Sequence, residues 1–124
     1  MTPIEALAQH RQICDVLYDI ALEENRFLQQ QQRPPEQTLI ERKRTALEKL
    51  DETMAALRAV PSGSVREPEL RAALDKIRSR IMQILQLDKE NEQLLLRYSL
   101  SRGTPVPGPS VAPGMLQKIY SRHS

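Results

Sequence analysis

The positions of the prolines constrain the fold of this 124-residue chain more than any other feature of its sequence. Its nine prolines stand at 3, 34, 35, 61, 68, 105, 107, 109 and 113. Proline lacks a backbone N–H and clashes with the preceding turn, so it is tolerated at the start of a helix and breaks a helix interior. We therefore expect three long helices, over about residues 3–33, 35–60 and 66–102, followed by a tail over residues 103–124.

The residues at the ends of these segments favour helices as well. Thr2-Pro3-Ile4-Glu5 has the pattern of a capping box, in which Thr2 caps the first turn and Glu5 reaches back to it. Gly103 follows Arg102 at the expected end of the third segment, and a glycine directly after the last helical residue commonly ends a helix. The low aromatic content of 3% argues against β-sandwiches and barrels.

Each long segment carries apolar residues at alternating three- and four-residue steps, as helices packed in a coiled-coil manner do. This spacing, together with the short breaks between segments, predicts an all-α fold. We expect residues 1–102 to form an antiparallel up-down-up three-helix bundle, followed by a flexible Pro/Gly-rich tail. The clearest stripe lies in the second segment and contains Ile40, Leu47, Leu50, Met54 and Leu57.

Polar residues interrupt the stripes at one level of the predicted bundle. In the register of a hairpin, Glu24 of the first helix faces Lys43 of the second, and the third helix brings Asp88 and Asn91 to the same level. A buried polar layer of this kind penalises slipped alignments, so we favour a structural role. The alternatives are that Lys43 extends to solvent along its aliphatic stem, or that the carboxylates form a metal or acid–base site. A structural role predicts that Lys43→Met leaves the bundle folded or stabilises it.

The sequence offers no residues for catalysis. The two histidines, His10 and His123, are far from the polar layer, and the only cysteine, Cys14, falls on the core stripe. A single cysteine excludes an internal disulfide framework. A glycine-rich phosphate loop, a nucleophile elbow and metal-ligand spacing are all missing from the sequence. We therefore expect no enzyme, no cofactor and no metal.

Charge and hydropathy limit the partners and the location. The sixteen acidic residues precede Gly103 and are matched there by sixteen of the eighteen basic ones, so the surplus is Lys118 and Arg122. Residues 1–102 therefore carry no net charge, whereas proteins that bind nucleic acids usually have a concentrated basic surface. The sequence has no long apolar run and no signal-peptide pattern, so we expect no membrane insertion and a cytoplasmic location.

The third segment carries more apolar residues than a three-helix core needs. Met82, Leu85, Leu96 and Leu100 have no obvious neighbour, and Tyr98 and Leu100 should project beyond the turn that joins the first two helices. In the tail, residues 115–121 form a short amphipathic segment. Either these surfaces bind a partner, or the tail folds back and covers the third helix; the sequence leaves both open.

Three groups of residues resemble the FlgN-type flagellar export chaperones, which look after the hook-associated proteins. They are Glu24-x-x-x-Leu28, Leu39-Ile40-x-x-Lys43-x-x-x-Leu47-x-x-Leu50, and Asn91-x-x-Leu94-Leu95. The resemblance covers about residues 7–100 and implies a non-enzymatic cytoplasmic chaperone. Such a protein would hold the helical terminal segment of its clients until they reach the type III export apparatus.

The resemblance also implies where a client would bind, because that family uses its C-terminal part. On this chain the implied partner-binding residues are Leu87, Leu94, Leu95, Tyr98, Leu100, Met115, Leu116, Ile119 and Tyr120. The competing hypothesis is a non-catalytic helical adaptor or structural bundle that self-associates through the third helix, as a homodimer would.

Overall fold

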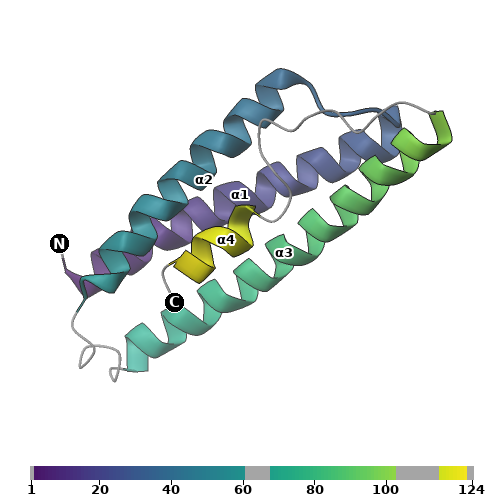
Figure 1. Ribbon diagram of the computed structural model, residues 1–124. Helices are drawn as coiled ribbons and strands as arrows, with labels where there is room; N and C mark the ends of the chain where they lie inside the picture. Colours follow the sequence, from purple (N-terminus) through teal and green to yellow (C-terminus); the bar gives the residue numbers. More distant parts are fainter. Residues whose placement is uncertain (1, 61–67, 103–114, 123–124) are drawn as a thin grey trace.

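The computed structural model describes residues 2–60, 68–102 and 115–122, and in these residues it contains four helices and no strand (Figure 1). The helices are α1 (Pro3–Gln31), α2 (Gln37–Arg58), α3 (Pro68–Arg102) and α4 (Met115–Arg122). The prediction of an all-helical fold is confirmed for this part of the chain. The second turn, residues 61–67, and the first half of the tail, residues 103–114, lie outside the described residues.

The two ends of α1 follow from local sequence. At its start the predicted capping box is present: the Glu5 N–H donates to Thr2 Oγ1 at 3.2 Å, and the Thr2 N–H donates to Glu5 Oε2 at 3.3 Å. At its end Gln32 takes a left-handed conformation with φ 51°, and its N–H donates to the Leu28 carbonyl. The helix stops before the predicted Arg33, because a residue that precedes proline is disfavoured in the helical region.

The second helix is shorter than predicted at both ends. It begins at Gln37 rather than at Pro35, because Glu36 keeps an extended backbone and acts as the N-cap without a side-chain hydrogen bond. It ends at Arg58, two residues before Val60. Differences of one or two residues at helix ends leave the register of the stripes unchanged.

Helix α1 packs against both α2 and α3, and polar contacts show the relative directions (Figure 1). Towards α2, residue 10 of α1 meets residue 53 and residue 24 meets residue 43, so these two helices run in opposite directions. Towards α3, residue 15 meets residue 80 and residue 25 meets residue 91, so α1 and α3 run in the same direction.

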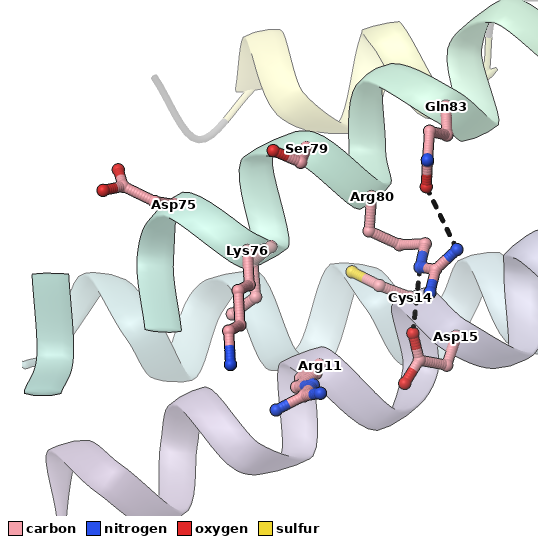
Figure 2. A pocket seen from close by; sticks show the side chains of 9 residues that line it. Arg11, Cys14, Asp15, Asp75, Lys76, Ser79, Arg80 and Gln83 are labelled. Carbon is pink, nitrogen blue, oxygen red and sulfur yellow. Dashed lines mark hydrogen bonds and ion pairs between the residues drawn. The ribbon is translucent and has the colours of Figure 1, made fainter. Parts of the chain in front are cut away.

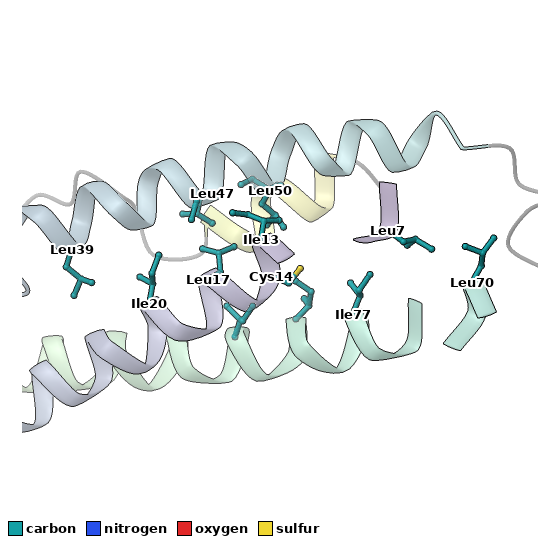
Figure 3. Packing of buried hydrophobic residues seen from close by; sticks show 14 residues of the cluster. Leu7, Ile13, Cys14, Leu17, Ile20, Leu39, Leu47, Leu50, Leu70 and Ile77 are labelled. Atoms are coloured by element: carbon teal, nitrogen blue, oxygen red, sulfur yellow. The ribbon is translucent and has the colours of Figure 1, made fainter. Parts of the chain in front are cut away.

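The core is aliphatic and lies along the inner faces of these helices (Figure 3). Leu50 and Cys14 are completely buried, and Leu17 and Leu28 are almost so. At about 25 cal/mol per Å² of apolar surface, each buried leucine contributes about 2 kcal/mol. The core cluster contains Leu7, Ile13, Cys14, Leu17, Ile20, Leu39, Ala46, Leu47, Leu50, Leu70, Ile77, Ile81, Ile84 and Ile119.

The C-terminal helix α4 lies between α2 and α3 and over α1 (Figure 1). It corresponds to the amphipathic segment predicted over residues 115–121 and extends one residue further. Ile119 on its inner side belongs to the core cluster. No helix in the described part of the chain combines the length and apolar character needed to cross a bilayer.

Candidate functional site

The four residues expected to form a polar layer lie together. Lys43 Nζ is 3.1 Å from Asp88 Oδ1 and 3.4 Å from Glu24 Oε1. Asn91 Nδ2 donates to the same Glu24 oxygen at 3.0 Å and to the Ala21 carbonyl at 3.1 Å. One layer thus connects α1, α2 and α3 through a lysine shared by two carboxylates.

Burial and charge together make Lys43 a fixed cation. Its side chain is 16% exposed, against 13% for Glu24 and 22% for Asp88. Burial alone would lower the pKa of Lys43, but the carboxylates of Asp88 and Glu24 outweigh burial and raise it. No cluster of three or more candidate metal ligands occurs among the described residues.

The polar layer continues towards the surface through Asn25 and Gln29, which do not stand out in the sequence pattern. Asn25 Nδ2 donates to Asn91 Oδ1 at 2.9 Å, and Gln29 Nε2 donates to Asn25 Oδ1 at 2.9 Å. The signal for Asn25 was its position directly after Glu24, on the side of α1 that turns towards α3. The amide chain fixes the orientation of Asn91.

A second buried polar cluster shows that the expectation of a single layer in an otherwise aliphatic bundle is wrong. His10 Nδ1 lies 2.7 Å from Thr53 Oγ1, and His10 Nε2 lies 2.9 Å from the Tyr120 hydroxyl. The Tyr120 hydroxyl also hydrogen-bonds the thiol of Cys14. These residues come from α1, α2 and α4, so the cluster joins α4 to the rest of the bundle.

The hydrogen bonds of this cluster fit one consistent set of proton positions. Thr53 donates to the Leu50 carbonyl at 2.9 Å, so its oxygen accepts from His10 Nδ1–H. His10 Nε2 then accepts from the Tyr120 hydroxyl. Across the described residues, no buried side-chain nitrogen or oxygen lacks a hydrogen-bond partner.

Burial keeps every member of the cluster neutral. It lowers the pKa of His10 to about 4, raises the pKa of Cys14 to about 12 and raises the pKa of Tyr120. A thiol that stays protonated is a poor nucleophile. The cluster is therefore suited to holding α4 in place and not to covalent catalysis.

Helix α4 is anchored at three successive points. Ile119 is only 4% exposed and packs in the core, Tyr120 bonds His10, and Arg122 Nη1 lies 3.2 Å from Asp51 Oδ2 on α2. We call the surface that receives these three side chains the α4 groove. Its polar contacts come from His10, Cys14 and Asp51.

The residues of the implied partner-binding surface fall into separate environments. Leu100 is 81% exposed and available, whereas Leu87, Leu94, Leu95 and Tyr98 are half-buried. Ile119 is buried and Tyr120 is half-buried in the α4 groove, so the nine residues do not form one open surface. Met115 and Leu116 lie in α4, but the positions of their side chains are outside the described residues.

The expectations for the unpartnered residues of α3 need two corrections. Leu85 is half-buried and packs against the core cluster. Tyr98 is half-buried with an interaction partner and its neighbour Ser99 is buried, so these two residues are less exposed than expected, whereas Leu100 is 81% exposed. Met82 and Leu96 are exposed, at 65% and 42%, so α4 does not cover them.

A cleft of about 350 Å³ lies between α1 and α3 (Figure 2). Arg80 crosses it, donating to Asp15 Oδ1 at 3.1 Å and to Gln83 Oε1 at 3.0 Å. The Arg80 guanidinium also stacks 4.2 Å from the centre of the Tyr18 ring. The cleft is lined by charges of both signs, so its electrostatics select no single class of ligand.

Comparison of the chain with protein-family models, with curated proteins and with solved structures gives no match.

Proposed function

We propose that this chain is an export chaperone of the FlgN type, built as an up-down-up three-helix bundle. It holds the helical terminal segment of flagellar hook-associated proteins in the cytoplasm before type III secretion and catalyses no reaction. The observation that carries this proposal is the α4 groove, in which an amphipathic helix places Ile119 in the core of the bundle. A bundle that accepts an amphipathic helix in this way can hide a similar segment of a client.

The exposed apolar residues of α3 support the same proposal. Met82 and Leu96 are 14 residues apart, and Leu96 and Leu100 are 4 residues apart. At 3.6 residues per turn these spacings differ from four turns and one turn by only about 0.1 turn. They therefore share one face of α3, which we call the α3 stripe. The α3 stripe offers a client helix an apolar surface of its own on the bundle.

The position of α4 adds a condition to client binding. Ile119 and Tyr120 are occupied within the chain, so they can contact a client only after α4 leaves its groove. The net free energy of client binding, after the cost of displacing α4, should correspond to micromolar to nanomolar affinity, because a chaperone must also release its client.

A second candidate function is a self-associating adaptor. The observation that favours it is the α3 stripe, because two copies could pair their exposed residues across a two-fold axis. Lys89 is exposed between Met82 and Leu96, so such a seam would also bring two lysines close together.

Co-expression with candidate hook-associated proteins tests the first function against the second. We expect a soluble complex with a single defined stoichiometry, measured by size-exclusion chromatography with light scattering. Leu96→Ser with Leu100→Ser should weaken it, whereas Lys49→Ser, at an exposed position of α2, should not. A dimer that dissociates on the double substitution, with no complex formed with any client, would instead support the adaptor.

A further inference from the structure

The contacts of α4 define what kind of helix its groove accepts. Ile119 fills an apolar position and is 4% exposed. The next residue, Tyr120, directs its hydroxyl to the buried His10 Nε2 at 2.9 Å, and Arg122 pairs with Asp51 at 3.2 Å. The groove therefore contacts an aliphatic side chain, a phenolic hydroxyl and a cation at positions i, i+1 and i+3 of the helix that occupies it.

The tyrosine hydroxyl is the most selective of the three. His10 is 1% exposed and its Nδ1–H is committed to Thr53, so its Nε2 needs a donor from the occupant of the groove. A phenylalanine in the same place would fill the volume and leave Nε2 without a partner. The aliphatic position selects for size only, and the Arg122–Asp51 pair is half-exposed and therefore weak.

Two features make α4 an exchangeable occupant rather than a fixed part of the core. It has eight residues, too few for a helix that is stable by itself. It is also joined to α3 through the twelve-residue sequence GTPVPGPSVAPG, so it competes for the groove as a tethered ligand at an effective concentration on the order of millimolar. A free helix with the same three side chains competes against that concentration.

We propose that the α4 groove is a recognition site for partner helices that carry an aliphatic residue, a tyrosine directly after it and a cation two residues later, and that α4 is its resident occupant. The proposal rests on the proposed function only where it names a client as the competing helix. The chemistry of the groove is tested without a client.

The single cysteine of the chain reports on the groove. Cys14 is completely buried and hydrogen-bonds Tyr120, so its reaction with a disulfide reagent should be slow while α4 is in place. Ile119→Ser combined with Tyr120→Ala in the full chain should release α4 and raise the reaction rate at least tenfold. The matched control is Lys118→Ala, at an exposed position of α4, which should leave the rate within twofold.

The probe is the synthetic peptide MLQKIYSR, which has the sequence of Met115–Arg122. Added at millimolar concentration to the released variant, it should return the Cys14 reaction to within threefold of the wild-type rate. The same peptide with Tyr120→Phe should protect at least fivefold less at equal concentration. Circular dichroism and thermal melting confirm that the released variant is folded, and Tyr120→Phe in the full chain serves as the milder variant if it is not.

Three results would overturn the proposal. They are an unchanged Cys14 reaction rate in a folded released variant, no protection by the peptide, and equal protection by the tyrosine and phenylalanine peptides. A hook-associated protein is then added to the wild-type chain. Faster Cys14 reaction in the complex supports competition for the groove, whereas a stable complex with an unchanged rate overturns the competition and leaves the chaperone proposal standing. Protection by the peptide without any client complex keeps the recognition site and removes the chaperone function.

Discussion

Replacing Lys43 by methionine should destabilise the protein strongly, which reverses what the sequence pattern suggested. The lysine lies 3.1 Å from Asp88 and 3.4 Å from Glu24, and all three side chains are less than a quarter exposed. At an effective dielectric constant of ~20, each contact is worth about 5 kcal/mol before desolvation. The substitution removes the cation and leaves two carboxylates facing each other inside the bundle.

The cost of that substitution can be estimated from the geometry. Removing one partner of a buried ion pair costs about 3–5 kcal/mol. The partial exposure of Asp88 and the lower desolvation cost of methionine reduce this, so we expect a loss of roughly 2–4 kcal/mol, or roughly 8–16 °C in Tm at about 4 °C per kcal/mol. Lys49→Met is the matched control, because Lys49 is 60% exposed and pairs only with Glu52; it should change stability by less than about 0.5 kcal/mol.

Urea unfolding at pH 7 measures both variants. Adding Asp88→Asn to Lys43→Met should recover part of the loss at neutral pH. A Lys43→Met protein as stable as wild type at pH 7 would show that the carboxylates remain well hydrated. The ion pairs would then not hold α1, α2 and α3 in register.

The remaining predictions concern the histidine, the core and one helix end. Burial lowers the pKa of His10 from 6.5 to about 4, so between these pH values the unfolded chain binds a proton that the native protein does not bind. The free energy of unfolding should therefore fall by up to about 3 kcal/mol as the pH decreases from 6.5 to 4. His10→Gln should reduce this dependence on pH, measured by urea unfolding at several pH values. Leu50→Ala, at a completely buried position, should cost about 2–5 kcal/mol in thermal melting, whereas Leu100→Ala, at an 81% exposed position, should change it by less than about 0.5 kcal/mol. Gln32→Gly should stabilise by up to about 1 kcal/mol, because glycine takes a φ of 51° without strain; an equal or lower Tm would contradict that account of the helix end.

The three long helices and the charged layer could be predicted because their determinants are local or complementary. Proline marked the breaks, and the spacing of leucine and isoleucine marked the faces. Opposite charges at Glu24 and Lys43 then fixed the register between two helices, because any slip would place a charge against leucine. The third member, Asp88, followed once the stripes were aligned.

The neutral cluster could not be predicted, because its members look ordinary in the sequence. Thr53 reads as a surface residue of α2, and Tyr120 lies 110 residues from its partner His10. Periodicity shows which face of each helix is apolar, but it does not show that α4 can lie between α2 and α3. The sequence shows that residues 115–121 form an amphipathic segment, but it does not show where that segment packs.

The two polar clusters stabilise different parts of the molecule. The charged layer around Lys43 joins α1, α2 and α3 and uses no residue of α4. The neutral cluster around His10 and Cys14 joins α4 to α1 and α2, and it lies at least seven residues earlier along α1, about 10 Å or more from the charged layer. Interactions that far apart usually contribute independently to stability. Loss of α4 would therefore cost the contacts of its groove and leave the register of the three long helices intact, which is the property that an exchangeable helix requires.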